Sequence, residues 1–164
     1  IQSLLHTEIL NLRELMQQMK PVEYDPKQFL DFLAQLVERF RRDTGIVAHF
    51  VTSVGEADMP TRVGSEVARI LQEALVNIRK HSGARNVLVR FDTQDGLWKL
   101  AIDDDGCGFD FSGKLSQPEL DEARIGPVVI KERLRSIGGQ LTIESEPGHG
   151  ARLEITFPQK RNGQ

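Results

Sequence analysis

Apolar residues recur three and four positions apart in four segments of the chain, the spacing of a helix with one buried face. Pro21 ends the first segment, Asp25 is a good N-cap for the second, and glycines at 45, 83 and 138 follow the last turns of the others. The pattern therefore predicts helices over residues 4–19, 26–44, 63–81 and 127–137.

Five shorter runs are rich in β-branched and aromatic residues and predict strands at 46–52, 87–91, 97–102, 140–146 and 151–157. Glycine-containing turns join the second strand to the third and the fourth to the fifth, as in hairpins. The element order predicts an α/β (α+β) two-layer sandwich, with helices on one face of a mixed, mostly antiparallel sheet and an additional N-terminal helix. Residues 110–124 show no clear period and predict a long surface loop or lid.

The first helix carries an apolar stripe formed by Leu5, Ile9, Leu12, Leu15, Met16 and Met19. It either packs back on the domain or belongs to a helical bundle whose other members are missing. Because the chain starts within this helical pattern and without a methionine, we expect it to be a piece of a longer protein.

Composition narrows the class of protein. The 164 residues contain one cysteine, Cys107, which excludes an internal disulfide framework and fits a reducing compartment. No apolar run reaches the roughly 18 residues of a membrane span, and the charged start is unlike a signal peptide, so we expect a cytoplasmic location. A net charge of −3 gives no support for nucleic acid as a partner.

The third predicted helix carries a polar face with candidate chemistry. Glu73 and Asn77 are four residues apart, with Lys80 and His81 one turn further along. Oxygen ligands of this kind suit Mg²⁺, and a lysine can hold a phosphate. The alternative is an ordinary solvated helix face. Asn77 favours a functional role, because asparagine is a poor helix former.

Acids and glycines follow the third predicted strand in the run DDDGCGF, residues 103–109. Glycine lets the backbone approach a ligand closely, and the Asp104 carboxylate can accept a hydrogen bond from an exocyclic amine such as that of adenine. A calcium-like acidic turn or a plain β-turn is the alternative, although no glutamate stands at the EF-hand distance. We expect Cys107 to be a small loop residue and no nucleophile.

Gly126 lies at the start of the helix at 127–137, where free amides and the helix dipole favour a phosphate. Pro127 removes one amide donor, which the guanidinium of Arg124 could offset. A capped surface helix is the alternative. Residues 147–150 predict a hairpin turn with His149 at its exposed tip.

In this order, the segments EALVNIRKH, DDGCGF and GPVVIKERLRSIGGQLTIESEPGHGARLEITFP resemble the ATP-binding catalytic domain of two-component sensor histidine kinases. This family belongs to the GHKL ATPase superfamily, with type II topoisomerases, a heat-shock chaperone and mismatch-repair ATPases. The chain is most similar to the subfamily that pairs with helix-turn-helix response regulators. The resemblance implies a Bergerat-type ATP-binding fold that uses ATP and Mg²⁺.

The resemblance also implies roles for single residues. Asn77 would hold Mg²⁺, Glu73 would orient a metal-bound water or the attacking group, and Asp104 would receive the adenine amino group. Lys80 is the second catalytic candidate. The other nucleotide-binding candidates are His81, Gly106, Gly108, Arg124, Gly126, Gly150 and Ala151.

By the same resemblance, residues 1–21 are the end of a dimerisation and histidine-phosphotransfer hairpin, and residues 22–164 are the catalytic domain. The domain would transfer the γ-phosphoryl group of ATP to a histidine on an upstream helix of the same or a partner subunit. In this family a Glu or Asp directly follows the histidine that accepts the phosphoryl group. No such residue directly follows His6, which we therefore expect to be a histidine of the apolar stripe or of the surface. The implied partners are a response regulator receiver domain and a second copy of the parent.

Arg124, Pro127 and Ala151 stand where the family commonly has glycine, leucine and threonine, which predicts weaker nucleotide binding within the same fold. Two other functions remain as alternatives at this stage. One is a degenerate, non-catalytic nucleotide-binding module, and the other is a serine kinase that inactivates a sigma-factor antagonist.

Overall fold

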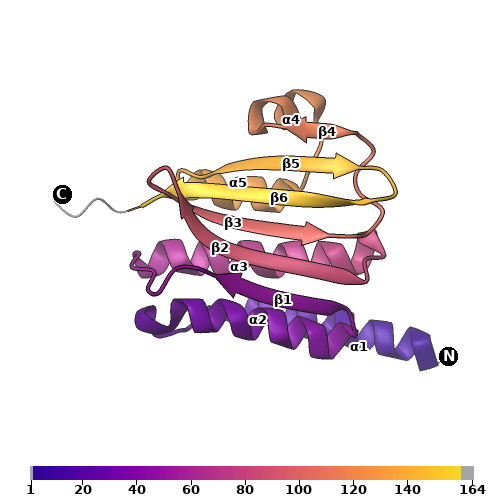
Figure 1. The fold of residues 1–164 in the computed structure, drawn as a ribbon. Coiled ribbons are helices and arrows are strands. Elements are labelled where there is room, and N and C mark those ends of the chain that lie inside the picture. The colour runs from indigo at the N-terminus through magenta and orange to yellow at the C-terminus, as the bar shows by residue number, and fades with distance from the viewer. Residues whose placement is uncertain (1, 160–164) are drawn as a thin grey trace.

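A computed structural model describes residues 2–159 as a six-stranded sheet covered by helices (Figure 1). The helices are α1 (Gln2–Met19), α2 (Phe29–Thr44), α3 (Thr61–Asn77), α4 (Gln117–Ala123) and α5 (Val128–Ser136), with a 3-10 turn at Pro26–Gln28 and a π turn at Ile78–Ser82. The strands are β1 (Val47–Thr52), β2 (Asn86–Gln94), β3 (Leu97–Asp104), β4 (Gly113–Leu115), β5 (Gln140–Glu146) and β6 (Gly150–Pro158). Residue 1 and residues 160–164, the end of the predicted catalytic domain, lie outside the described residues.

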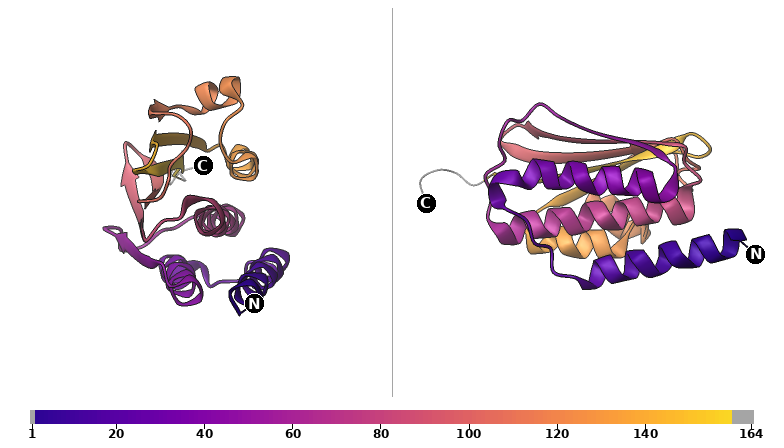
Figure 2. Two further views of the ribbon diagram at one scale, coloured as in Figure 1. Left: turned by 90° about the vertical axis from the view of Figure 1, so that its right-hand side faces the viewer. Right: turned by 90° about the horizontal axis from the view of Figure 1, so that it is seen from below.

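The strand order is β1-β2-β3-β6-β5-β4, with β1 parallel to β2 and every other neighbouring pair antiparallel. Helices α2, α3 and α5 cover one face of this sheet, while its other face stays open (Figure 2, left). The predicted two-layer sandwich with a mixed, mostly antiparallel sheet is therefore confirmed.

The core between sheet and helices contains an aromatic cluster centred on Phe91, which is fully buried. Its ring stacks on Trp98 at 5.3 Å between centroids and meets Phe29 of α2 edge-on at 5.7 Å. Aromatic pairs of this geometry contribute about 0.5–1.5 kcal/mol beyond their buried area. The cluster thus joins α2 to the start of β3.

Helix α1 packs on the domain with its polar face. Leu10 is its only buried residue, whereas the apolar stripe predicted from the sequence is exposed, with Leu12 59% and Met19 77% accessible. The Arg79 guanidinium of the π turn bonds Glu14 and Asn11, the latter at 2.7 Å. The stripe therefore does not enter this domain's core, and α1 lies outside the α2 and α3 layer (Figure 2).

The expectation of a long loop at 110–124 is wrong, because this segment contains β4 and α4. Strand β4 pairs with β5 from Gly113↔Ser145 to Leu115↔Ile143. Helix α4 begins with a capping box, in which Ser116 N donates to Glu119 Oε2 at 2.7 Å. Both elements are too short to show a period in the sequence.

Within residues 2–159, no helix has both the length and the apolar character that crossing a membrane would require.

Candidate functional site

A cavity of about 380 Å³ opens between the C-terminal end of α3, the end of β3 and the start of α5. Its size falls in the range of about 300–1,000 Å³ that is usual for small-molecule sites. It is lined by Ala74, Asn77, Ile78, His81, Ser82, Ile102, Asp104, Gly108, Phe109, Gly126, Pro127, Ala151 and Leu153. The walls are mainly apolar, with a few polar groups that could orient a ligand.

The helical end of the cavity is shaped by the π turn that follows Asn77. Ser82 Oγ donates to Ile78 O at 2.7 Å and accepts from Ala84 N at 3.0 Å, and Gly83 ends the turn with a φ of 65°. A π turn widens the last helical turn, and such turns are frequent at functional sites. The sequence predicts this helix up to His81, although not its change of winding.

Asp104 reaches the cavity because strand residues alternate between the two faces of the sheet. Trp98, Leu100 and Ile102 of β3 are buried toward the helices, so Asp104 shares their face. Its Oδ1 accepts a hydrogen bond from Gly106 N at 2.8 Å. Burial raises the pKa of Asp104 above 3.8, and the charges of Asp105 and Asp103 add to this effect against the opposing hydrogen bond.

The two neighbouring acids have structural partners. Asp103 lies on the open face of the sheet and bonds Arg152 of β6. Asp105 Oδ1 accepts from the backbone N–H groups of Arg85 and Asn86, both at 2.8 Å, and thereby fixes the start of β2. Asn86 Nδ2 also donates to Asp105 Oδ2 at 2.8 Å, and this bond, followed by the backbone bonds, lowers the pKa of Asp105. Of the three acids, Asp104 alone lines the cavity.

Glycines at 106, 108 and 150 let three backbone segments meet around Asp104. A Cβ at Gly106 would lie 2.4 Å from Ser82 O, and one at Gly150 would lie 2.0 Å from Asp104 O. At Gly108, whose φ is 71°, a Cβ would lie 2.8 Å from Gly150 O. These glycines therefore shape the cavity by close backbone packing.

The wall formed by the segment before α5 holds Gly126 and Pro127. Gly126 has a φ of 96°, which disfavours any residue with a side chain. Arg124 ends α4 in the left-handed conformation, with a φ of 55°, and its side chain is exposed. Arg124 does not line the cavity.

The structure thus brings six of the predicted site residues to one cavity: Asn77, His81, Asp104, Gly108, Gly126 and Ala151. Gly106 and Gly150 pack directly behind it. Glu73 is half-buried one turn before Asn77, where its Oε2 accepts from Gln18 Nε2 at 3.1 Å. Lys80 is exposed on the π turn. Neither of these two side chains lines the cavity.

Several residues that form the site were not predicted. Ile102, Leu153 and Phe109 are apolar wall residues, whose sequence pattern is that of ordinary core positions. Buried Ser145 of β5 holds Phe109 in place, because its Oγ accepts from Phe109 N at 2.8 Å. Only the tertiary fold brings Ser145 to this loop.

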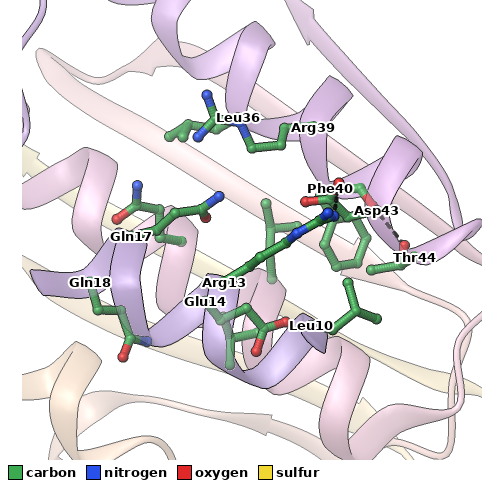
Figure 3. A pocket seen from close by; sticks show the side chains of 13 residues that line it. Leu10, Arg13, Glu14, Gln17, Gln18, Leu36, Arg39, Phe40, Asp43 and Thr44 are labelled. Atoms are coloured by element: carbon green, nitrogen blue, oxygen red, sulfur yellow. Dashed lines mark hydrogen bonds and ion pairs between the residues drawn. The ribbon is translucent and has the colours of Figure 1, made fainter. Parts of the chain in front are cut away.

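A second, smaller cavity of about 50 Å³ lies between α1, α2 and α3 (Figure 3). Arg13 of α1 reaches across it toward Asp43 of α2, with 3.8 Å between Nη1 and Oδ1. Its volume is far below that of a small-molecule site. We interpret this small cavity as a packing defect between α1 and the helices beneath it.

The lining of the larger cavity suits a purine nucleotide. The carboxylate of Asp104, set among apolar walls, can accept a hydrogen bond from an exocyclic amine. The carboxamide oxygen of Asn77, on another wall, is a ligand type that suits a hard cation such as Mg²⁺. Burial between apolar walls also suits a flat, aromatic base.

Comparison with known proteins gives the same picture. Residues 63–161 match the family described as histidine kinase-, DNA gyrase B-, and HSP90-like ATPase. The signal transduction histidine-protein kinase/phosphatase DegS of Brevibacillus brevis is 30% identical over 159 residues, which are 96% of this chain and 39% of that protein. The chain spans 25–39% of the lengths of the first curated relatives that it matches.

Solved structures share the fold. The blue-light activated histidine kinase of Erythrobacter litoralis EL346 superposes with a TM-score of 0.64 at 16% identity, covering 82% of this chain and 42% of that one. The ATP binding domain of PrrB from Mycobacterium tuberculosis gives 0.60 at 22% identity, covering 80% and 93%.

Proposed function

Because the chain belongs to the family of histidine kinase-, DNA gyrase B- and HSP90-like ATPases, we propose that it is the ATP-binding catalytic domain of a two-component sensor histidine kinase. One observation carries the proposal: Asn77 and Asp104, 27 positions apart in the chain, line the same cavity. In a cell, such a domain would work on the cytoplasmic side, where ATP is available.

The adenine base would occupy the part of the cavity next to Asp104. The ionised carboxylate would accept a hydrogen bond from the amino group, and Ile102 and Leu153 would contact the ring. Ala151 pairs directly with Asp104 across the sheet, so it provides a small apolar contact at this position. Specificity for adenine would come from the one charged acceptor among apolar walls.

The phosphates would lie between the end of α3 and the segment at Gly126, and Mg²⁺ would be held by the oxygen of Asn77. A bound Mg²⁺ would neutralise phosphate charge during transfer. His81 lines the same wall, and Lys80 and Arg124 are exposed cations close in sequence to this part of the cavity. Lys80 and Arg124 could turn toward the phosphates, since long exposed side chains change rotamer easily.

Glu73 would orient the attacking group or a metal-bound water, as its place one turn before Asn77 allows. The γ-phosphoryl group would pass to a histidine on a helix upstream of this chain. Catalysis by the protein would consist mainly of positioning and charge neutralisation.

We further propose that residues 1–21 are the end of a dimerisation and phosphotransfer hairpin and that residues 22–164 form the catalytic domain. The support is the exposed stripe of α1, whose apolar residues are left free because its polar face packs on α3 and the π turn. Neighbouring helices of a bundle would cover this stripe in a dimer of the parent. A response regulator receiver domain would then accept the phosphoryl group.

Calorimetric titration with a non-hydrolysable ATP analogue tests the nucleotide site. We expect Mg²⁺-dependent binding that Asp104→Asn nearly abolishes, whereas Asn77→Ala keeps adenosine binding and loses the dependence on Mg²⁺. Asp95→Asn is the matched control, because Asp95 lies in the β2–β3 turn with a φ of 54°, which asparagine tolerates. Tight binding that neither site substitution changes would contradict the proposal.

Phosphotransfer would require the proposed phosphoacceptor helix. The upstream hairpin of the parent, added in trans with Mg-ATP, should acquire acid-labile phosphate. Nucleotide binding without any transfer would favour a non-catalytic regulatory module, and acid-stable phosphoserine on a protein substrate would favour the serine kinase.

A further inference from the structure

Lys131 of α5 is the only buried charged side chain among residues 2–159, with 7% of its surface exposed. Burying an ammonium group is costly unless strong acceptors surround it. Surface lysines are usually solvated, so this burial requires a specific reason.

The Lys131 ammonium bridges two parts of the segment that precedes α5. Its Nζ donates to Asp121 Oδ1 of α4 at 2.9 Å and to the backbone carbonyl of Ile125 at 3.1 Å. The first bond fixes helix α4 and the second fixes the chain after it has left that helix. Lys131 therefore ties α5, α4 and their connection together.

This connection contains Gly126, which lines the cavity directly after Ile125. The connection has no regular secondary structure, and two of its residues, Arg124 and Gly126, have positive φ. Two backbone bonds tie it to α4, from Arg124 N to Asp121 O at 3.2 Å and from Ile125 N to Leu120 O at 2.9 Å, and its far end accepts a bond from Lys131 N at Pro127 O, at 3.1 Å. The bond from Lys131 Nζ is the one that holds the carbonyl of the Ile125–Gly126 peptide.

We propose that Lys131 is a positioning residue, which holds the Ile125–Gly126 peptide in the place required for binding the phosphates of the nucleotide. This inference rests on the proposed function, since it assumes that phosphates lie against Gly126. Lys131 acts through the backbone and does not itself line the cavity. Without it, the binding-competent arrangement of residues 124–127 would be only a minor population, and the apparent affinity would fall in proportion.

The test compares Mg-ATP and adenosine binding in the wild type and in Lys131→Met, which keeps the length of the side chain and removes its charge. We expect the affinity for Mg-ATP to fall about ten-fold or more, the effect of losing charge-assisted hydrogen bonds. Adenosine binding should stay within about two-fold, because the wall at Asp104 is untouched. Lys131→Arg should recover most of the loss.

Arg135→Gln is the matched control, because the exposed Arg135 also bonds Asp121, at 3.3 Å, but makes no bond to Ile125. It should bind Mg-ATP like the wild type. Hydrogen exchange supplies a second readout: the amides of residues 124–126 should exchange faster in Lys131→Met, while those of β3 stay protected. If Lys131→Met fails to fold, Lys131→Gln, which is shorter and uncharged, gives the same comparison.

The outcomes separate the two proposals. A wild type that binds neither ligand overturns the proposed function. A wild type that binds both, with Lys131→Met unchanged toward Mg-ATP, overturns only the positioning role. Equal losses for Mg-ATP and adenosine, with faster exchange throughout the sheet, would show that Lys131 merely stabilises the fold and would also overturn it.

Discussion

Replacing Gly106 by alanine should damage both the fold and the nucleotide site, for a reason that can be worked out from distances. The new Cβ would lie 2.4 Å from Ser82 O, whereas ordinary contacts begin near 3.4 Å, so the loop must move by about 1 Å. That shift would break the 2.7 Å bond from Cys107 N to Ser82 O. A lost hydrogen bond costs about 1 kcal/mol and overpacking about 1–3 kcal/mol, which gives about 2–4 kcal/mol of lost unfolding free energy.

Urea unfolding followed by the fluorescence of Trp98, the single tryptophan, measures this loss. Gly55→Ala is the control, because a Cβ there meets nothing within 4 Å and its φ is not in the positive range. It should change the unfolding free energy by less than about 0.5 kcal/mol. Nucleotide affinity should fall only for Gly106→Ala, because Gly106 N also holds Asp104. Equal stability of the two variants, with equal affinity, would refute the close approach of the loop to the π turn.

Three further predictions concern a titrating carboxylate, an ion pair and an added hydroxyl group. Because burial raises the pKa of Asp104, its carboxylate is fully ionised only well above that raised pKa, and adenosine affinity should be lost as pH falls through it. Calorimetry over a pH series measures this loss, and a midpoint at or below the ordinary value of 3.8 would contradict it. Arg79→Met should lower the unfolding free energy by about 1–3 kcal/mol, since it strands the half-buried carboxylate of Glu14, whereas Arg41→Met at an exposed pair should cost less than about 1 kcal/mol in the same urea assay. Ala151→Thr places a hydroxyl next to Asp104 and should tighten adenosine binding by up to about ten-fold in calorimetry, while weaker binding would argue against space for a donor there.

The sequence predicts the sandwich well because its main elements carry strong periods. The helical spacing in 29–44 and the alternation in 151–157 reflect burial against a single core, so pattern and structure agree. The features that the sequence does not predict are either short elements or depend on residues distant in the chain. Strand β4 has three residues and exists through its pairing with β5, and the outward direction of the α1 stripe is decided by polar contacts with Arg79.

The candidate site divides in the same way. Asn77 could be selected because asparagine is a poor helix former within a predicted helix, and Asp104 because it directly follows a predicted apolar strand. Their meeting in one cavity depends on the register that brings Val87 opposite Asp104 and the end of α3 close to both. The burial of Lys131 could not be predicted, because lysine in a helix is normally solvated, and this burial depends on α4, which the sequence did not predict.

The aromatic cluster and the proposed nucleotide cavity occupy opposite ends of β3. Trp98 and Asp104 share one face of this strand but are six residues apart, a separation of roughly 20 Å. A substitution at one end should therefore have little effect on the packing or the chemistry at the other. A lineage could retune its ligand, or abandon it, while inheriting an intact scaffold, and thermal tolerance could evolve without touching the chemistry.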